Sequence, residues 1–130
     1  MSPPPIPFAF SLDPRTGVPV YRQIIDQVLG GIASGTLQPG DQLPTVRQLA
    51  VDLAINPNTV IRSYRELELR GALSTQQGIG TFIAHQAPAP DLARREADLD
   101  RFVADLLARA GAAGFTAREI HARLGDTLES

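Results

Sequence analysis

The sequence predicts an α+β fold that is mostly α, in which three short helices and a β-hairpin precede a short helical tail. Three observations predict it. Apolar residues recur every three or four positions through residues 19–35, 45–53 and 56–70, which is the period of an amphipathic helix. Residues 72–85 read as two short strands around a Gly-rich turn. A proline-rich break at residues 86–90 then precedes further helical periodicity.

Length and composition bound the number of domains and the available chemistry. The chain has 130 residues, 43% of them apolar, which suits one domain or a domain with a short appendage. It has no cysteine, so disulfides, thiolate metal sites and cysteine nucleophiles are excluded. We find no apolar run approaching the roughly 20 residues of a membrane span, and no signal peptide. We therefore expect a cytoplasmic protein with no membrane partner.

The charge balance does not by itself favour a polyanionic partner. The formal net charge is −2, and all 12 basic residues are arginine. Residues 43–71 carry four arginines against three acidic residues, whereas residues 91–130 carry eight acidic residues against six arginines. A case for nucleic acid must therefore rest on where the arginines lie.

Residues 1–17 are predicted to form an N-terminal arm. The stretch "MSPPPIP" favours an extended conformation. Phe8, Phe10 and Leu12 alternate with a period of two, which predicts a short strand. The stretch "DPRTG" that follows predicts a turn.

The first helix is predicted between Pro19 and Gly35, because proline is tolerated at a helix start and glycine is typical of a helix end. Its apolar stripe consists of Tyr21, Ile24, Ile25, Val28, Leu29 and Ile32.

Two further helices follow, with a tight turn between them. Thr45 and Gln48 have the spacing of a capping box, which satisfies backbone donors at a helix start. Asn56 is predicted as the next N-cap, with Pro57 at the first helical position, where a missing N–H costs nothing. Gly71 then provides a natural C-terminal stop.

The order helix, helix, tight turn, helix and hairpin describes a winged helix-turn-helix, predicted here over residues 18–86. In that motif the second helix of the tightly joined pair enters the major groove of DNA and the helix before it crosses the backbone. The complete prediction is a winged helix-turn-helix followed by a C-terminal helical dimerisation tail at residues 87–130.

Helix geometry places polar groups on the outward face of the third helix. At about 100° per residue, Val60, Tyr64 and Leu67 share the side that faces the core. Asn58 and Arg62 each lie about 200° from Val60, on the opposite side. Asparagine pairs well with adenine, and arginine with guanine, in the major groove.

The remaining DNA-binding candidates flank that ridge, begin the preceding helix or form the hairpin tip. An arginine early in the preceding helix lies off its apolar stripe and can reach a phosphate, and glycines at the tip let the backbone approach DNA closely. Taken singly, each is explained as a solvated side chain, a cap or a turn; their joint order and spacing favour DNA. The candidates are Arg47, Asn58, Thr59, Arg62, Ser63, Arg65, Gln77, Gly78 and Gly80.

Residues 19–84 resemble the winged-helix domain of the GntR family of bacterial transcription regulators. The matching stretches include "PVYRQI", "PGDQLPTVRQLA", "NPNTVIRSYRELE" and "GTFI". The Asn-Pro-Asn-Thr-Val start with Arg62 and Tyr64, together with the short tail, is similar to the YtrA-type subfamily. The resemblance supports DNA roles at Arg47, Asn58, Thr59, Arg62 and Gly78.

The resemblance also implies partners and a role. It implies a homodimeric repressor bound to a double-stranded operator that is an inverted repeat. Relatives of the subfamily often control neighbouring ABC-transporter genes, so a small operon of that kind is the candidate target. Many other GntR relatives carry an arginine at the position of Ile61, so base readout there is not carried over. Whether a small-molecule effector binds stays open.

The tail is far shorter than a usual ligand-binding domain. After the linker "QAPAP", its apolar positions predict a long amphipathic helix that is broken at "GAAG". Thr116 and Glu119 predict a capping box for a last helix that runs to about Leu124. We expect a dimerisation element; the alternative is a tail packed on its own winged domain. The dimerisation candidates are Leu99, Phe102, Val103, Leu106 and Leu107.

No constellation in the sequence supports an enzyme. His85 and His121 lie far apart and lack a partner at metal-binding spacing. The stretch "GIASG" is not the Gly-x-Ser-x-Gly nucleophile elbow. We predict no catalytic residue, metal or cofactor. A winged-helix protein-interaction module without specific DNA readout is the alternative function, against which the outward Asn58 and Arg62 argue.

Overall fold

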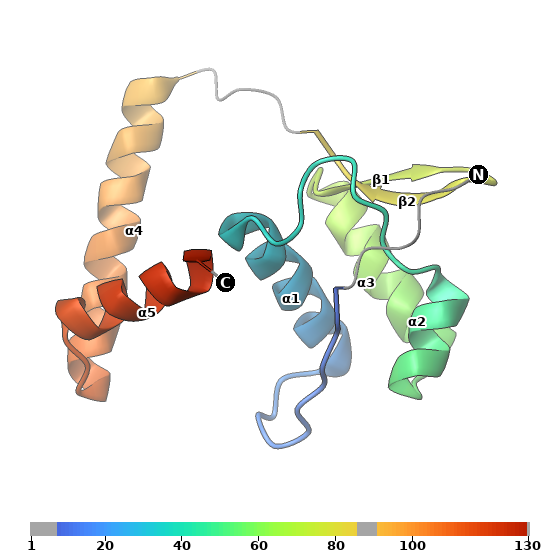
Figure 1. Cartoon of the computed structure of the whole chain (residues 1–130), viewed down its shortest axis with the longest axis horizontal. Helices are drawn as coiled ribbons and strands as arrows, with labels where there is room; N and C mark the ends of the chain where they lie inside the picture. Colours follow the sequence, from blue (N-terminus) through green and yellow to red (C-terminus); the bar gives the residue numbers. More distant parts are fainter. Residues whose placement is uncertain (1–7, 86–90, 130) are drawn as a thin grey trace. The chain divides into compact units, whose positions relative to one another are not determined.

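The computed structural model describes residues 8–85 and 91–129. The chain divides into two compact units, Met1–Gln86 and Ala87–Ser130. The predicted arm at residues 1–7 and the linker at residues 86–90 lie outside the described residues. Figure 1 shows the elements along the chain, and the mostly helical α+β class with a winged helix-turn-helix is as predicted. The elements are α1 Val20–Ser34, α2 Val46–Leu53, α3 Pro57–Leu69, β1 Leu73–Gln76, β2 Gly80–Ile83, α4 Leu92–Ala113 and α5 Ala117–Glu129.

The strand predicted before α1 is wrong, since residues 8–12 adopt no regular secondary structure. Their backbone bonds to side chains of α1 instead of to a neighbouring strand. The Ser11 N–H donates to Gln27 Oε1 at 2.9 Å, and Gln27 Nε2 donates back to the Ser11 carbonyl at 2.8 Å. Gln23 makes the same pair of bonds with the backbone of Asp13. The two side-chain amides thus satisfy the donors and acceptors that a strand partner would have satisfied.

The start and end of α1 and the N-terminal cap of α2 lie where the sequence predicts them. Pro19 precedes α1, and Gly35 ends it in the left-handed conformation with φ of 84°. At the start of α2, Thr45 Oγ1 accepts the N–H of Gln48 at 3.1 Å. That bond satisfies one of the backbone donors that the first turn of a helix leaves free.

A turn of three residues, 54–56, joins α2 to α3. Ala54 ends α2 with φ of 55° and is the one non-glycine residue of the described chain with a positive φ. Asn56 then caps α3 by accepting the N–H of Asn58 on Oδ1 at 2.8 Å, as predicted. Gly71, with φ of 78°, follows the end of α3. The two helices are therefore joined with almost no intervening chain.

The wing is an antiparallel hairpin of β1 and β2, in which Leu73 lies opposite Ile83. The loop before α2 adds a bridge to the outer side of β2, where Gln42 pairs with Phe82. The wing is therefore tied to the helix-turn-helix through both β1, which follows α3, and the loop that leads into α2.

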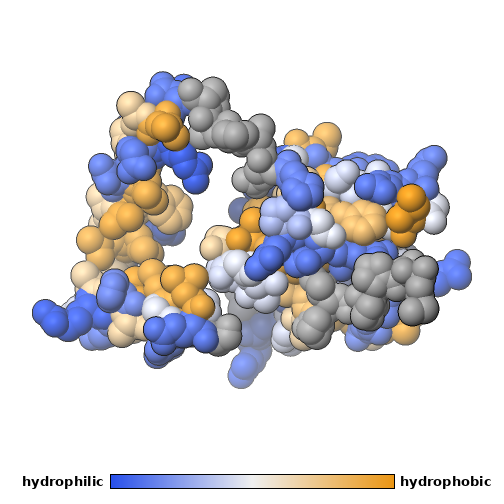
Figure 2. Space-filling model, turned by 45° about the horizontal axis from the view of Figure 1, so that its top comes forward, coloured by the Kyte–Doolittle hydropathy of each residue, from blue (hydrophilic) through white to orange (hydrophobic). Residues whose placement is uncertain are grey.

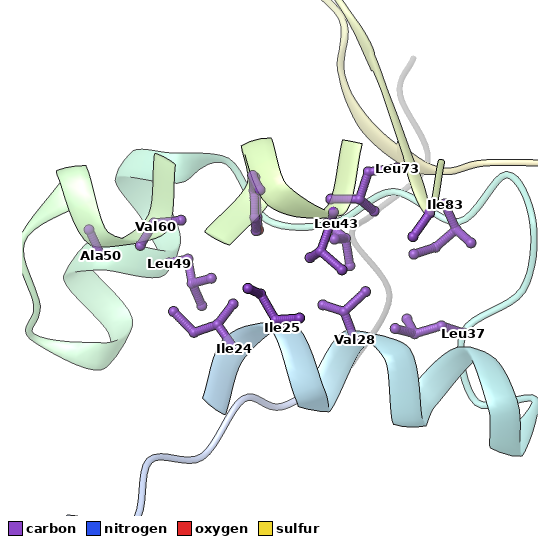
Figure 3. Packing of buried hydrophobic residues seen from close by; sticks show 13 residues of the cluster. Ile24, Ile25, Val28, Leu37, Leu43, Leu49, Ala50, Val60, Leu73 and Ile83 are labelled. Atoms are coloured by element: carbon purple, nitrogen blue, oxygen red, sulfur yellow. The ribbon is translucent and has the colours of Figure 1, made fainter. Parts of the chain in front are cut away.

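One cluster of buried apolar side chains joins α1, α2, α3 and the wing (Figure 3). Ile24, Ile25 and Val28 point from α1 toward α3 and the wing, and each is at most 1% exposed. Phe8 and Phe10 pack on the edge of this cluster with ring centroids 5.0 Å apart. Among the described residues, every buried side-chain nitrogen or oxygen has a hydrogen-bond partner.

The second unit is a pair of helices. Gly114, with φ of 87°, ends α4 within the break that the sequence predicts. The Thr116 hydroxyl accepts the N–H of Glu119 at 3.2 Å, which confirms the predicted cap of α5. The predicted end near Leu124 is wrong, because α5 continues to Glu129 through a glycine that weakens a helix without ending it. None of the helices in the described ranges is both long and apolar enough to cross a membrane.

Candidate nucleic-acid interface

Helix α3 buries the side that the sequence predicts. Val60 and Leu67 are fully buried and Tyr64 is 3% exposed, whereas Asn58 and Arg62 are exposed. The most extensive contact of α3 is with α1, and the two helices lie side by side in Figure 1. The amide and the guanidinium in the first half of α3 therefore face away from the core.

A shallow, open depression runs along this outward face of α3. Arg62 and Arg65 border it, and within the described chain neither has a carboxylate within 4.0 Å. Glu66 also borders it but is paired with Arg70, with 3.3 Å between Oε1 and Nε. The free charge on this surface is therefore positive. The depression is lined by Asn58, Ile61, Arg62, Arg65, Glu66 and Leu69.

Ser63, predicted as a DNA-binding residue, has a different place. It is completely buried, and its hydroxyl donates to the carbonyls of Tyr21 and Thr59, each at 3.0 Å. At about 100° per residue Ser63 lies about 60° from Val60, beside the core side of α3 and not on the outward ridge, and α1 covers it. Ser63 therefore fixes the start of α1 to α3. Because its hydroxyl is buried, it does not form part of the DNA-binding surface, contrary to the prediction. Thr59, one turn earlier, is partly exposed.

The guanidinium of Arg62 stacks on an aromatic ring of α1. Its Cζ lies 3.7 Å from the centroid of the Tyr21 ring, the geometry of a cation–π contact. A second open depression is lined by both residues together with Val20, Asn56, Asn58 and Thr59. The beginning of α1 thus contributes to the same surface as the beginning of α3.

Tyr64 fixes the angle between α2 and α3 from the buried side. Its hydroxyl donates to the Pro44 carbonyl, just before α2, at 2.8 Å. Burial raises the pKa of the Tyr64 phenol far above its usual value, so the hydroxyl keeps the proton that it donates.

Arg47 is exposed at the second position of α2. Its neighbours Thr45 and Val46 line an open groove together with wing residues 75–81. Gln77 lies in that wing segment and is exposed. The groove therefore joins a helix N-terminus, whose free N–H groups favour a phosphate, to the tip of the wing.

The two wing glycines have different surroundings. Gly78 has φ of 77°, and the Ile79 N–H donates to the Gln76 carbonyl at 3.0 Å. This is the pattern of a type II turn with glycine at its third position. A Cβ added at Gly78 would meet no atom of the described residues within 4 Å. A Cβ at Gly80 would lie 2.5 Å from Nε2 of Gln42. The Gln42 amide is the end of a flexible side chain that can move away, so the φ of 151° at Gly80 is what favours glycine there, whereas, among the described residues, the space around Gly78 is open.

Residues 20–83 match the family described as "Bacterial regulatory proteins, gntR family". The structure of YtrA from Sulfolobus acidocaldarius, a GntR-family transcription factor, is 30% identical with a TM-score of 0.57. That similarity covers 73% of this chain and 95% of that chain.

The chain belongs to the GntR family.

Other relatives are named as DNA-binding regulators. The HTH-type transcriptional repressor YtrA of Bacillus subtilis (strain 168) is 46% identical over 76 residues, which are 58% of each chain. This GntR-family chain thus covers less than two thirds of that repressor. The DNA-binding domain of AraR in complex with operator ORE1 is 27% identical with a TM-score of 0.50, over 59% of this chain and 94% of that one. These homologues are transcriptional regulators, not enzymes.

Every DNA-binding candidate lies inside the region that matches the GntR family, and two residues of the surface were missed. Tyr21 belongs to the predicted apolar stripe of the first helix, and nothing in the local sequence indicates its contact with Arg62. Ile61 was set aside, yet it is 38% exposed and lines the depression on α3. In the described residues no group of three potential metal ligands occurs.

Proposed function

We propose that this GntR-family chain is a sequence-specific DNA-binding transcription repressor that acts as a homodimer. The outward face of α3 carries this proposal, because it combines an amide with two guanidinium groups that have no ion-pair partner among residues 8–85 and 91–129, and its one carboxylate is paired with Arg70. A major groove about 12 Å wide admits an α-helix. In the docked state α3 lies in that groove and α2 crosses the backbone.

The side chains on α2 and α3 have distinct roles in this proposal. Asn58 and Arg62, near the start of α3, read adenine and guanine edges. Thr59 and Arg65 flank them and contact the adjacent backbone. Arg47, at the start of α2, neutralises a phosphate and supplies affinity without sequence selectivity.

The wing supplies a contact outside the major groove. Gln77 and Gly78 lie at its tip, and the space around Gly78 is open. The minor groove is only about 6 Å wide, so a tip without a side chain can approach its sugar-phosphate wall.

The tail helices provide the proposed contact between two copies. Figure 2 shows apolar surface along α4 and α5. Along α4, Leu99 is 54% exposed, Phe102 62%, Val103 43% and Leu107 41%. Leu106 is only half-buried, and with Phe115 of the following turn it lines an open apolar hollow between α4 and α5.

A second copy of the same tail matches this surface chemically, because the stripe repeats at three and four residues as in paired helices. A dimer with two-fold symmetry presents two winged domains in inverted orientation, so its operator is an inverted repeat. Residues 87–130 then act as the dimerisation tail and residues 18–86 as the DNA-binding domain. The candidate target is a small operon, such as one encoding an ABC transporter. The protein would act on it in the cytoplasm.

Binding to DNA tests the function directly. An operator is selected from random duplexes, and titrations compare it with a scrambled duplex at several salt concentrations. We expect operator binding at least 1000-fold tighter than binding to the scrambled duplex, on the order seen for specific regulators. Equal affinity for both duplexes would leave a protein-interaction module as the better description.

The dimer is tested with a matched pair of substitutions in the full chain. Phe102→Glu places a charge in the apolar stripe, and Ala108→Glu places the same charge at an exposed position on the opposite side of α4. We expect light scattering to give a monomer for Phe102→Glu and a dimer for the Ala108→Glu control. A monomeric wild-type chain would remove the homodimer from the proposal.

A further inference from the structure

A cation–π contact on the proposed DNA surface joins two segments that are far apart in the sequence. Arg62 comes from the second turn of α3, and the ring beneath it belongs to Tyr21, the second residue of α1. The proposed function assigns Arg62 to base readout and gives Tyr21 no role. The stack is therefore a contact whose function has not been explained.

The position of the Tyr21 ring is fixed through its own backbone. The buried hydroxyl of Ser63 donates to the Tyr21 carbonyl at 3.0 Å and to the Thr59 carbonyl at 3.0 Å. Ser63 follows Arg62 directly in α3. One turn of α3 therefore both holds the backbone of Tyr21 and places a guanidinium over its ring.

Stacking restrains Arg62 without occupying its hydrogen-bond donors. A guanidinium lying on an aromatic face keeps its N–H groups in its own plane, where they point away from the ring. In the described chain no carboxylate lies within 4.0 Å of Arg62, so no ion pair competes for these donors. An arginine that is already restrained loses less side-chain entropy when it binds.

The shape of the surface agrees with a role in binding. Tyr21, Asn58 and Arg62 line one open depression, so the ring lies at the surface that a DNA duplex would meet. A ring that served only the core would not need to lie at this edge.

We propose that Tyr21 is a positioning residue for DNA readout, which stacks beneath Arg62 and holds its guanidinium ready for a base edge. The inference rests on the proposed DNA-binding function. Because the stack acts through Arg62, its contribution is to the affinity for the operator and not to general affinity for phosphate.

The test uses the full chain and a matched pair of variants. Tyr21→Leu removes the ring, whereas Tyr21→Phe keeps the ring and removes only the hydroxyl. Anisotropy titrations at one salt concentration compare a selected operator with a scrambled duplex. We expect Tyr21→Leu to raise the Kd for the operator about two- to five-fold and to leave the scrambled duplex unchanged, as for loss of an exposed cation–π contact. Tyr21→Phe should bind like wild type.

A double-substitution cycle separates the stack from a loss of folding. In an Arg62→Ala background, Tyr21→Leu should have no further effect on operator affinity, because the group that it positions is absent. Tyr21→Met provides a second variant without a ring if Tyr21→Leu lowers the melting temperature. Additive losses in the cycle, equal losses for Leu and Phe, or tighter binding by Tyr21→Leu would each overturn the inference. A wild-type chain that does not prefer the operator would instead overturn the proposed function.

Discussion

Two adjacent glycines of α1 should respond in opposite directions to the same substitution. Gly30 is exposed, and within the part of the chain that the structure describes a Cβ added there would meet no atom within 4 Å. Gly31 is buried, and a Cβ there would lie 2.8 Å from Cδ1 of Leu37 and 2.9 Å from Cε2 of Phe8. Real carbon atoms do not approach so closely, so Gly31→Ala must displace one of these side chains.

The magnitudes follow from two separate effects. Alanine is favoured over glycine within a helix by about 1 kcal/mol, so this effect raises the free energy of unfolding of both Gly30→Ala and Gly31→Ala. Overpacking a core costs about 1–3 kcal/mol, and only Gly31→Ala incurs it. Leu37 is 1% exposed and therefore enclosed by the core, whereas Phe8 is only partly buried. We expect Gly30→Ala to be more stable than Gly31→Ala by about 1–3 kcal/mol.

The assay is urea and thermal unfolding of the full chain, with the loss of helix monitored by far-UV circular dichroism. For a domain of 60–100 residues, 1 kcal/mol corresponds to a shift in Tm of about 4–8 °C. Gly30→Ala should melt above wild type and Gly31→Ala at or below it. Phe8→Ala in the Gly31→Ala background should cost less stability than Phe8→Ala alone, because it removes one of the clashing atoms. Equal stability of the two alanine variants would refute the packing of Phe8 and Leu37 on α1.

Further predictions concern the DNA surface and the helix-turn-helix. Arg62→Ala should cost about 1–3 kcal/mol of operator binding, as for loss of one base contact. Arg47→Ala should weaken binding to all DNA sequences alike and should lower the slope of log affinity against log salt concentration by about one ion. Equal losses on operator and scrambled DNA for Arg62→Ala would show that it contacts only phosphate. Ala54→Gly should stabilise the fold by up to about 1 kcal/mol in urea unfolding, because it relieves a left-handed alanine; a loss of stability would contradict this. Tyr64→Phe should destabilise by about 1 kcal/mol, because the Pro44 carbonyl loses its buried donor; an unchanged urea midpoint would show that the bond contributes little.

The sequence by itself determined the elements whose causes are local. Thr45 and Asn56 cap their helices through bonds that span two or three residues, so the residues that form each cap lie next to one another in the chain. The core side of α3 follows from helical periodicity in the same way, and Val60 and Leu67 are buried as that periodicity predicts. The motif over residues 20–83 was therefore enough to place the chain in its family.

Only the tertiary structure decided which neighbour each of these elements has. Residues 8–12 alternate like a strand, but their neighbour is the helix α1, whose glutamine side chains bond to the backbone instead. Periodicity places Ser63 about 60° from Val60, at the edge of the core side of α3, and only the structure shows that α1 covers it and that its hydroxyl bonds to the Tyr21 carbonyl. Tyr21 looks like an ordinary core residue until α3 brings Arg62 over its ring. In each case the deciding contact joins residues 16 to 42 positions apart, or joins two helices whose relative placement is set by the packed core. Periodicity along the chain carries no information about such contacts.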